Sequence, residues 1–266
     1  MYNEKGLRII SLKRTAITIT FRCTLKCKLC GVEIPFYNVP PHLSYNDFER
    51  IIDRYFQIVD YIDEFEISGG EALMHEDLSK IIEKSMQYKH KFNQLLIFTN
   101  GTIIPKTNVW DTLKKHRSKC HFFISDYGHI SSKVEELAHL LAENGITYRV
   151  KKYYGSDLHC GGWVDFGNFS PTTYDYKKCY YLSSDYCIQI RSGEIHMCGR
   201  SYRAMEIGAI EKNKNEYIDL LNDTSNILDL KKKLISMINL KELSVCKLCN
   251  GLCKDSPRFT PAEQLE

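Results

Sequence analysis

The residues of this chain best suited to redox chemistry are three closely spaced cysteines, Cys23, Cys27 and Cys30, which follow an apolar run at 16–21. An extended chain spans at most about 3.5 Å per residue, so these three sulfurs can hold only one compact object. A structural metal site is normally closed by four protein ligands. Three thiolates therefore predict an iron–sulfur cluster with one open iron, and the alternative is a zinc knuckle that takes a distant fourth ligand.

The composition is that of an ordinary globular protein without export or membrane signals. The 266 residues are 43% hydrophobic, and the net charge of +3 gives no electrostatic footprint for nucleic acid. The segment 1–14 lacks the apolar stretch of a signal peptide, and no run of 18 apolar residues predicts a membrane helix. Eleven cysteines in such a chain indicate metal binding in a reducing compartment. We expect a cytoplasmic protein with no nucleic-acid or membrane partner.

Strand-like and helix-like segments alternate along the first 152 residues. This alternation predicts an α/β fold with a parallel sheet. Ser44 with Asp47 is a plausible start of the first helix. The predicted strands are 16–21, 64–68, 95–99, 121–125 and 147–151, and the predicted helices are 45–61, 77–88, 109–117 and 132–144.

Polar or glycine-bearing motifs follow four of these strands. Because the carboxyl ends of parallel strands meet at one edge, these motifs are expected to converge on one rim. They are the cysteine loop after the first strand, Gly69-Gly70-Glu71 after the second, Asn100-Gly101 after the third, and Ser125-Asp126 at the end of the fourth.

The remainder of the chain divides at residue 179. Residues 153–178 read as a linker or substrate-facing segment, and a unit with further cysteines occupies 179–266. Within that unit we predict a hairpin at 187–198 that turns at Ser192-Gly193, and a helix around 227–238.

The three-cysteine loop together with Gly69-Gly70-Glu71 resembles the radical S-adenosylmethionine (SAM) superfamily. The resemblance covers about residues 15–152 and implies a partial (β/α) barrel. One departure is Leu29, because the residue before the last cysteine is usually aromatic in this family. The superfamily binds SAM at the open iron of a [4Fe-4S] cluster and cleaves it to a 5'-deoxyadenosyl radical that abstracts hydrogen from a substrate.

This resemblance implies roles for the other strand ends. Gly69 and Gly70 would allow close backbone approach, and Glu71 would help to orient the methionyl ammonium of SAM. Ser125 and Asp126 would contact the ribose or the methionyl part, and Asn100 would mark the rim of the site. Lys26 and Lys28, beside the cysteines, are expected to be solvated.

The unit at 179–266 resembles the auxiliary-cluster extension called a Twitch domain, which is related to the SPASM domain. In size and layout the chain is similar to the aminocyclitol dehydrogenases of the superfamily. By this resemblance a second [4Fe-4S] cluster would be held by four of the six cysteines in this unit. The expected ligands are Cys179, Cys198, Cys246 and Cys249, with Cys187 and Cys253 as alternates.

An auxiliary cluster without an open iron suits electron transfer and so favours dehydrogenation of a small polar metabolite such as a sugar or cyclitol. Epimerisation is the second outcome, for which Cys160 or Cys120 could return a hydrogen atom. The electron would come from a flavodoxin- or ferredoxin-type reductant. Candidate substrate-facing residues are Tyr153, Tyr154, His159, Trp163 and Asp165.

Two other functions remain open at this point. A peptide-modifying enzyme of the same superfamily is less expected, because no leader-recognition domain precedes Ala16. A non-catalytic metal-binding module is the alternative from another class.

Overall fold

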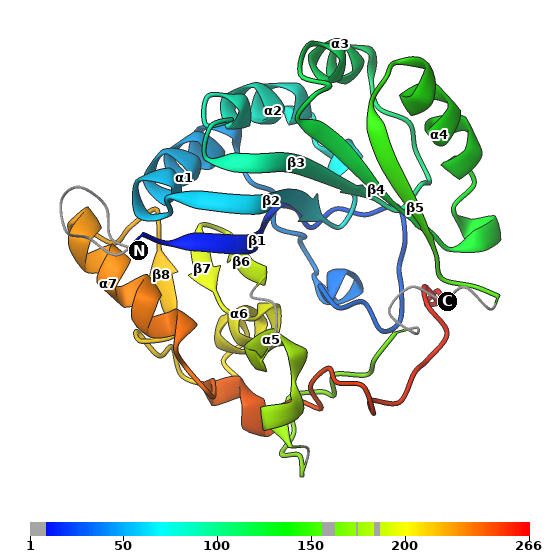
Figure 1. Cartoon of the computed structure of the whole chain (residues 1–266). Coiled ribbons are helices and arrows are strands. Elements are labelled where there is room, and N and C mark those ends of the chain that lie inside the picture. Colours follow the sequence, from blue (N-terminus) through cyan, green and yellow to red (C-terminus); the bar gives the residue numbers. More distant parts are fainter. Residues whose placement is uncertain (1–8, 156–162, 174, 184–186) are drawn as a thin grey trace.

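One sheet of eight strands carries the fold (Figure 1). The computed structural model describes residues 9–155, 163–173, 175–183 and 187–266. In this part of the chain the strand order is β5-β4-β3-β2-β1-β6-β7-β8, in which β5 to β6 run parallel and β7 and β8 are antiparallel. The strands are β1 (Ser11–Thr20), β2 (Tyr61–Gly69), β3 (Phe92–Thr99), β4 (Cys120–Asp126), β5 (Thr147–Lys152), β6 (Cys187–Arg191), β7 (Glu194–His196) and β8 (Tyr217–Asp219).

Four helices link the parallel strands and cover the outer face of the curved sheet (Figure 1). Each buries an apolar stripe, as α1 does with Phe48, Ile51 and Tyr55, all fully buried. Ser44 caps α1 as predicted, because its hydroxyl accepts the Asp47 N–H at 3.1 Å. These helices are α1 (Tyr45–Ile58), α2 (Leu78–Met86), α3 (Thr107–Lys115) and α4 (Val134–Glu143).

The five predicted strands and four predicted helices are present in the expected order, which confirms the α/β class and the partial barrel. Four of these strands begin earlier than predicted, as β1 does at Ser11 rather than at 16, whereas β5 begins at 147 as predicted. The first residues of β1 alternate between exposed and buried and include Lys13 and Arg14, so the apolar run did not mark them. The predicted turn is also present, with positive φ at both Ser192 (47°) and Gly193 (85°).

The cysteine-rich second half continues the same sheet. β6 pairs in parallel with β1, with Arg14 opposite Cys187. The predicted units 1–152 and 179–266 therefore contribute strands to the same sheet. The division into domains, with 153–178 as the connecting segment, stays a prediction. This half contains α5 (Tyr180–Ser183), α6 (Gly199–Glu206) and the predicted helix α7 (Ile227–Ile238). None of the helices in the described residues has the length and apolarity needed to cross a membrane.

Candidate active site

The loop with Cys23, Cys27 and Cys30, here called the first cysteine set, follows β1 and lies on the side of the sheet opposite to α1–α4 (Figure 1, blue). Cys27 is buried, and the other two are half-buried. Burial, together with the charges of the neighbouring thiols, raises the pKa of Cys23 to about 11 and that of Cys27 to about 12. Thiols with such a pKa are poor nucleophiles, and they ionise when a metal binds them. The first cysteine set therefore suits metal binding rather than free-thiol catalysis.

The spacing of the sulfurs bears on which metal group they suit. Thiolates around one zinc ion lie about 3.8 Å apart, given Zn–S bonds of about 2.3 Å. Across the described ranges, no three cysteine sulfurs lie within 4.8 Å of one another. The choice between an iron–sulfur group and a zinc ion is therefore left to the metal analysis described below.

Gly69 and Gly70 bring the end of β2 directly against the cysteine loop. The Gly70 N–H donates to the carbonyl oxygen of Thr20 at 2.9 Å. A Cβ on Gly70 would lie 2.3 Å from the Arg22 carbonyl oxygen and 2.9 Å from the Cys23 Cβ. A Cβ on Gly69, where φ is +150°, would lie 2.1 Å from the Thr20 carbonyl oxygen. Only glycine permits this approach, and the close contact expected of the two glycines is present, directed at the loop.

The structure gives Glu71 a supporting role, while its expected contact with the methionyl ammonium stays a prediction. Its carboxylate is fully buried and accepts hydrogen bonds from the Leu73 N–H (3.0 Å), the Thr99 hydroxyl (3.0 Å) and the Asn100 N–H (2.8 Å). These protein donors occupy the carboxylate, which joins the ends of β2 and β3. Glu71 therefore fixes the ends of β2 and β3, which carry residues of the site.

Glu71 should also make stability depend on pH. Burial raises its pKa from the usual 4.5 to about 7. As pH rises, the carboxyl loses its proton at a lower pH in the unfolded chain than in the folded one. We therefore expect the free energy of unfolding to fall by up to about 3 kcal/mol as pH rises from about 4.5 through about 7. Urea unfolding at a series of pH values checks this, and the Glu71→Gln variant should give a flatter profile. Glu135→Gln, at an exposed carboxylate of α4, is the control and should leave the slope unchanged; equal slopes in all three proteins would contradict the assignment.

Asn100 contacts the cysteine loop, while Ser125 and Asp126 do not. The Asn100 side-chain amide donates to the Thr24 hydroxyl at 3.0 Å and approaches the Cys23 Sγ at 3.6 Å. Asp126 is buried and accepts from the Gly128 N–H (2.9 Å) and the Tyr154 hydroxyl (2.8 Å). Asp126 thus shapes the turn after β4, and its expected contact with SAM stays a prediction, as does that of Ser125.

A cavity of about 220 Å³ lies beside the first cysteine set and is here called the thiol cavity. Tyr127 and Trp163 form its aromatic wall, with ring centroids 5.8 Å apart in an edge-to-face arrangement. Trp163 was among the expected substrate-facing residues, whereas Tyr127 was not, although it directly follows the Ser125-Asp126 strand end. The cavity is lined by Cys23, Leu25, Cys27, Cys30, Gly31, Val32, Ile34, Gly69, Gly70, Asn100, Tyr127 and Trp163.

The segment 262–265 packs against the cysteine loop, which the sequence did not indicate. The Gln264 side chain donates to the Cys27 Sγ at 3.4 Å and accepts the Lys26 N–H at 2.8 Å. Lys28 is exposed and its ammonium lies 3.3 Å from the Glu263 carboxylate. An amide donor on a metal-ligating sulfur stabilises its thiolate form, so Gln264 belongs to the site.

The second cysteine set consists of Cys179, Cys198, Cys246 and Cys249, all buried. Their thiols lie close enough to affect one another electrostatically: Cys249 and Cys179 each contribute to the raised pKa of Cys198, and both do so for Cys246. Burial is the larger cause and raises the pKa of Cys198 to about 12 and that of Cys246 to about 11. The structure thus brings the four expected auxiliary ligands together.

The two alternates lie in other surroundings. The Cys187 Sγ is 3.2 Å from the Gln189 side-chain amide and 3.9 Å from the Glu66 carboxylate. Cys253 is buried and accepts from the Ser256 hydroxyl at 3.6 Å. The choice of the second cysteine set over either replacement stays a prediction.

The structure describes one of the two cysteines expected as hydrogen donors. Cys120 is fully buried at the first position of β4. Six residue steps of about 3.3 Å separate it from the carboxyl end of that strand, so it lies roughly 20 Å from the rim and cannot serve a substrate there. Cys160 lies outside the described residues, as does His159.

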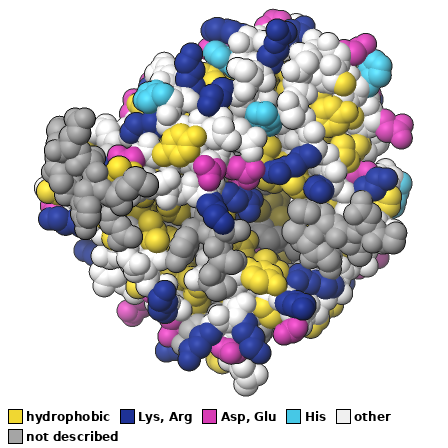
Figure 2. All heavy atoms as spheres, viewed as in Figure 1, with side chains coloured by type: hydrophobic (Ala, Val, Ile, Leu, Met, Phe, Trp, Pro, Cys, Tyr) yellow, Lys and Arg dark blue, Asp and Glu magenta, His cyan; other side chains and the backbone are white. Residues whose placement is uncertain are grey.

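A second cavity of about 300 Å³, here called the arginine cavity, adjoins the thiol cavity through Cys30. Asp165, one of the expected substrate-facing residues, lines it. Tyr153 instead packs on Tyr127, with ring centroids 5.0 Å apart. Figure 2 shows a face on which basic and apolar side chains border a recess. The arginine cavity is lined by Lys28, Leu29, Cys30, Glu33, Phe36, Val164, Asp165, Phe166, Gly167, Asn168, Phe169, Arg200, Arg203 and Ile207.

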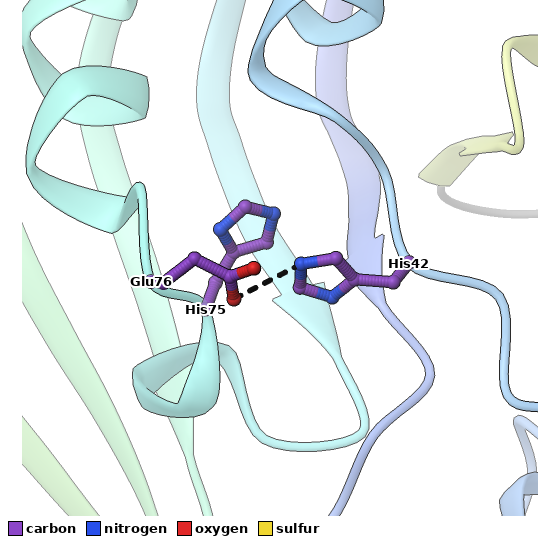
Figure 3. A group of neighbouring side chains, drawn as sticks. All are labelled: His42, His75 and Glu76. Carbon is purple, nitrogen blue, oxygen red and sulfur yellow. Dashed lines mark ion pairs between the residues drawn. The ribbon is translucent and has the colours of Figure 1, made fainter.

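His42, His75 and Glu76 form another group with metal-ligand atoms close together (Figure 3). Both ring nitrogens of His75 are already used: Nε2 lies 2.8 Å from the Leu43 carbonyl oxygen and Nδ1 accepts the Asp77 N–H at 3.1 Å. His42 binds the Glu76 carboxylate at 3.1 Å. His75 therefore has no lone pair left for a metal ion. We interpret this group as a hydrogen-bonded cluster that stabilises the turn after β2, and not as a metal site.

No protein-family model matches the chain. Among curated proteins it is similar to the GTP 3',8-cyclase of Aliarcobacter butzleri, with 36% identity over 92 residues, which are 34% of this chain and 28% of the relative. The GTP 3',8-cyclase of Sulfurovum sp. is 28% identical over 145 residues, or 54% of this chain and 42% of the relative. The chain thus spans less than half the length of these two relatives. The GTP 3',8-cyclase of Clostridium acetobutylicum is 23% identical over 276 aligned residues, which cover 95% of this chain and 80% of the relative.

Solved structures match along nearly the whole chain. The structure of BtrN in complex with AdoMet and 2-DOIA superposes with a TM-score of 0.59 at 12% identity and covers 95% of this chain and 99% of BtrN. The structure of anSMEcpe with bound AdoMet gives a TM-score of 0.57 at 16% identity and covers 97% and 90%. At these identities the likeness establishes a shared fold.

Proposed function

Because the chain has the fold of the radical SAM superfamily, as the resemblance of its cysteine loop predicted, we propose that it cleaves SAM reductively and abstracts hydrogen from a small polar metabolite. The net outcome would be dehydrogenation or epimerisation. The reductant would be of the flavodoxin or ferredoxin type. A cytoplasmic location remains part of this proposal.

One observation carries the proposal: three thiols, two glycines and the Asn100 amide from separate strand ends meet around the thiol cavity. The donor set fits a [4Fe-4S] group with one iron left open, and the adjoining glycine backbone and polar rim fit the amino-acid part of SAM. When bound, the cluster and SAM supply the radical chemistry. The protein's own task is to hold, orient and shield them.

The chain's residues divide that task. Gly69 and Gly70 let β2 touch the cysteine loop, and Glu71 locks the loop after β3. Tyr127 and Trp163 offer aromatic faces for the adenine, which Leu29 does not provide. The second cysteine set would hold an auxiliary cluster without an open iron, able to accept an electron from the substrate.

The choice of a small substrate is supported by the arginine cavity. Its volume of about 300 Å³ is at the lower end for small-molecule sites and leaves little room for a peptide. It offers aromatic, cationic and anionic side chains to a polar metabolite beside Cys30 of the first cysteine set. The name of the BtrN structure, which includes a small ligand beside AdoMet, supports the same class.

Two alternatives have support of their own. The similarity to GTP 3',8-cyclases favours a cyclisation that starts from a nucleotide, and three cations, Lys28, Arg200 and Arg203, line the arginine cavity. A structure of anSMEcpe with a bound peptide keeps peptide modification open. A non-catalytic module remains the alternative of another class, and the paired glycines against the cysteine loop argue against it.

Anaerobic reconstitution followed by metal analysis and a SAM cleavage assay tests the proposal. We expect about eight irons per chain for two four-iron clusters and 5'-deoxyadenosine after addition of dithionite. Zinc alone, or iron without SAM cleavage, would overturn it. Stimulation of 5'-deoxyadenosine formation by aminocyclitols, by GTP or by cysteine-containing peptides would then decide among the substrate classes.

A further inference from the structure

Arg191, the last residue of β6, is a buried cation that pairs with no carboxylate among the residues the structure describes. Its side chain is 5% exposed. Among the described residues its only hydrogen bond runs from Nη1 to the Gly199 carbonyl oxygen at 3.2 Å, and its Nε has no acceptor. An isolated buried charge costs several kcal/mol, so a guanidinium in this position calls for a negative group nearby.

The protein groups around Arg191 do not supply that charge. Its field reaches Cys30, Tyr181 and His196. Glu194, which lies opposite Arg191 in the sheet, is bonded instead to the His196 ring at 3.1 Å and to the Lys212 ammonium. No carboxylate in the described part of the chain is bonded to Arg191, which leaves a bound group to supply the charge.

The other arginines of this region differ, since each has a carboxylate. Arg200 bonds to Glu33, and Arg203 lies 3.3 Å from Glu33 and 2.6 Å from Glu206. These two cations and two anions balance one another. Arg191 differs from both in that no carboxylate of the described residues is bonded to it.

Arg191 stands between the two cysteine sets. It acts on Cys30 of the first set, and its guanidinium lies flat against Gly199, the residue after Cys198 of the second. The contact is so close that a Cβ on Gly199 would be 2.2 Å from Nη2. An iron–sulfur cluster held by three or four thiolates carries net negative charge, and nearby charges set its potential.

We propose that Arg191 is the charge-compensating residue of the metal-loaded protein, which stabilises the clusters on either side of it and makes their reduction easier. The proposal rests on the proposed function, because it needs iron–sulfur clusters at these cysteines. Arg191 is a positioning residue in this scheme: it touches neither SAM nor substrate.

The first test measures how much metal loading stabilises the chain. Urea unfolding midpoints are compared for metal-free and anaerobically reconstituted protein, in the natural sequence and in Arg191→Met and Arg191→Lys. We expect the increase in midpoint on loading to shrink in Arg191→Met and to be largely kept in Arg191→Lys, which retains the charge. Arg14→Met is the matched control: Arg14 bonds to Glu66 at 2.6 Å, so its loss should lower both forms alike and leave the increase unchanged.

The second test measures the reduction potentials by electron paramagnetic resonance at a series of poised potentials. In Arg191→Met we expect the one-electron reduction equilibrium of at least one cluster to shift at least tenfold toward the oxidised form. This shift corresponds to a decrease of about 59 mV in the reduction potential. Unchanged potentials and an unchanged loading increase in a variant with full iron content would overturn the proposal. A natural-sequence protein that binds no iron would instead contradict the proposed function, so the two failures are distinguishable.

Discussion

Replacing Gly70 with alanine is expected to remove most of the iron from the first cysteine set and to lower reductive SAM cleavage at least about 100-fold. The added Cβ would lie 2.3 Å from the Arg22 carbonyl oxygen and 2.9 Å from the Cys23 Cβ. Neither atom can rotate away, so the loop must move by close to 1 Å. A misplacement of that size can cost about a hundredfold in rate, and overpacking costs about 1–3 kcal/mol. Iron per chain and the initial rate of 5'-deoxyadenosine formation measure the effect.

Gly31→Ala is the matched control for this prediction. Gly31 lies in the same region of the chain and lines the same cavity, but its added Cβ would meet only the Phe166 ring, at an ordinary contact distance of 3.8 Å. We expect this variant to keep its iron and to stay within about twofold of the natural rate, because an ordinary contact requires no shift of the backbone. Equal losses in both variants would mean that the glycine contact with the loop is not the cause.

The parts of the site that could be predicted from the sequence are those fixed by neighbours along the chain. The spacing of Cys23, Cys27 and Cys30 indicates a shared metal group, and the order of strands and helices places their loop beside Gly69-Gly70. Both signals are local: one is ligand spacing, and the other is a hydrophobic period with polar residues at strand ends.

The parts that escaped prediction depend on contacts between residues far apart in the chain. Gln264 meets Cys27 across 237 positions, and nothing in its local sequence marks it. Glu71 has the sequence position of a ligand, yet the donors from residues 73, 99 and 100 turn it into a structural acceptor. The same holds for Arg191, whose burial without a carboxylate becomes visible only when α6 packs on β6.

The second large effect separates the two cysteine sets. Cys198→Ala is expected to lower the iron content from about eight to about four per chain, because a four-iron cluster needs its thiolate ligands. Cleavage of SAM should remain within a few-fold of natural, since the first cysteine set is untouched. Oxidation of the substrate should stop, because no acceptor remains for the second electron. Metal analysis, 5'-deoxyadenosine formation and product formation are measured on the same preparation.

Cys187→Ala distinguishes this ligand assignment from its alternate. The Cys187 sulfur lies 3.2 Å from the Gln189 side-chain amide and 3.9 Å from the Glu66 carboxylate, and the assigned ligand set excludes it. We therefore expect the variant to keep about eight irons. If Cys187→Ala lost about four irons and Cys198→Ala did not, Cys187 would be the ligand. Loss of SAM cleavage in Cys198→Ala with four irons retained would mean that the second set supports the first reaction step, and the division of labour between the two sets would be wrong.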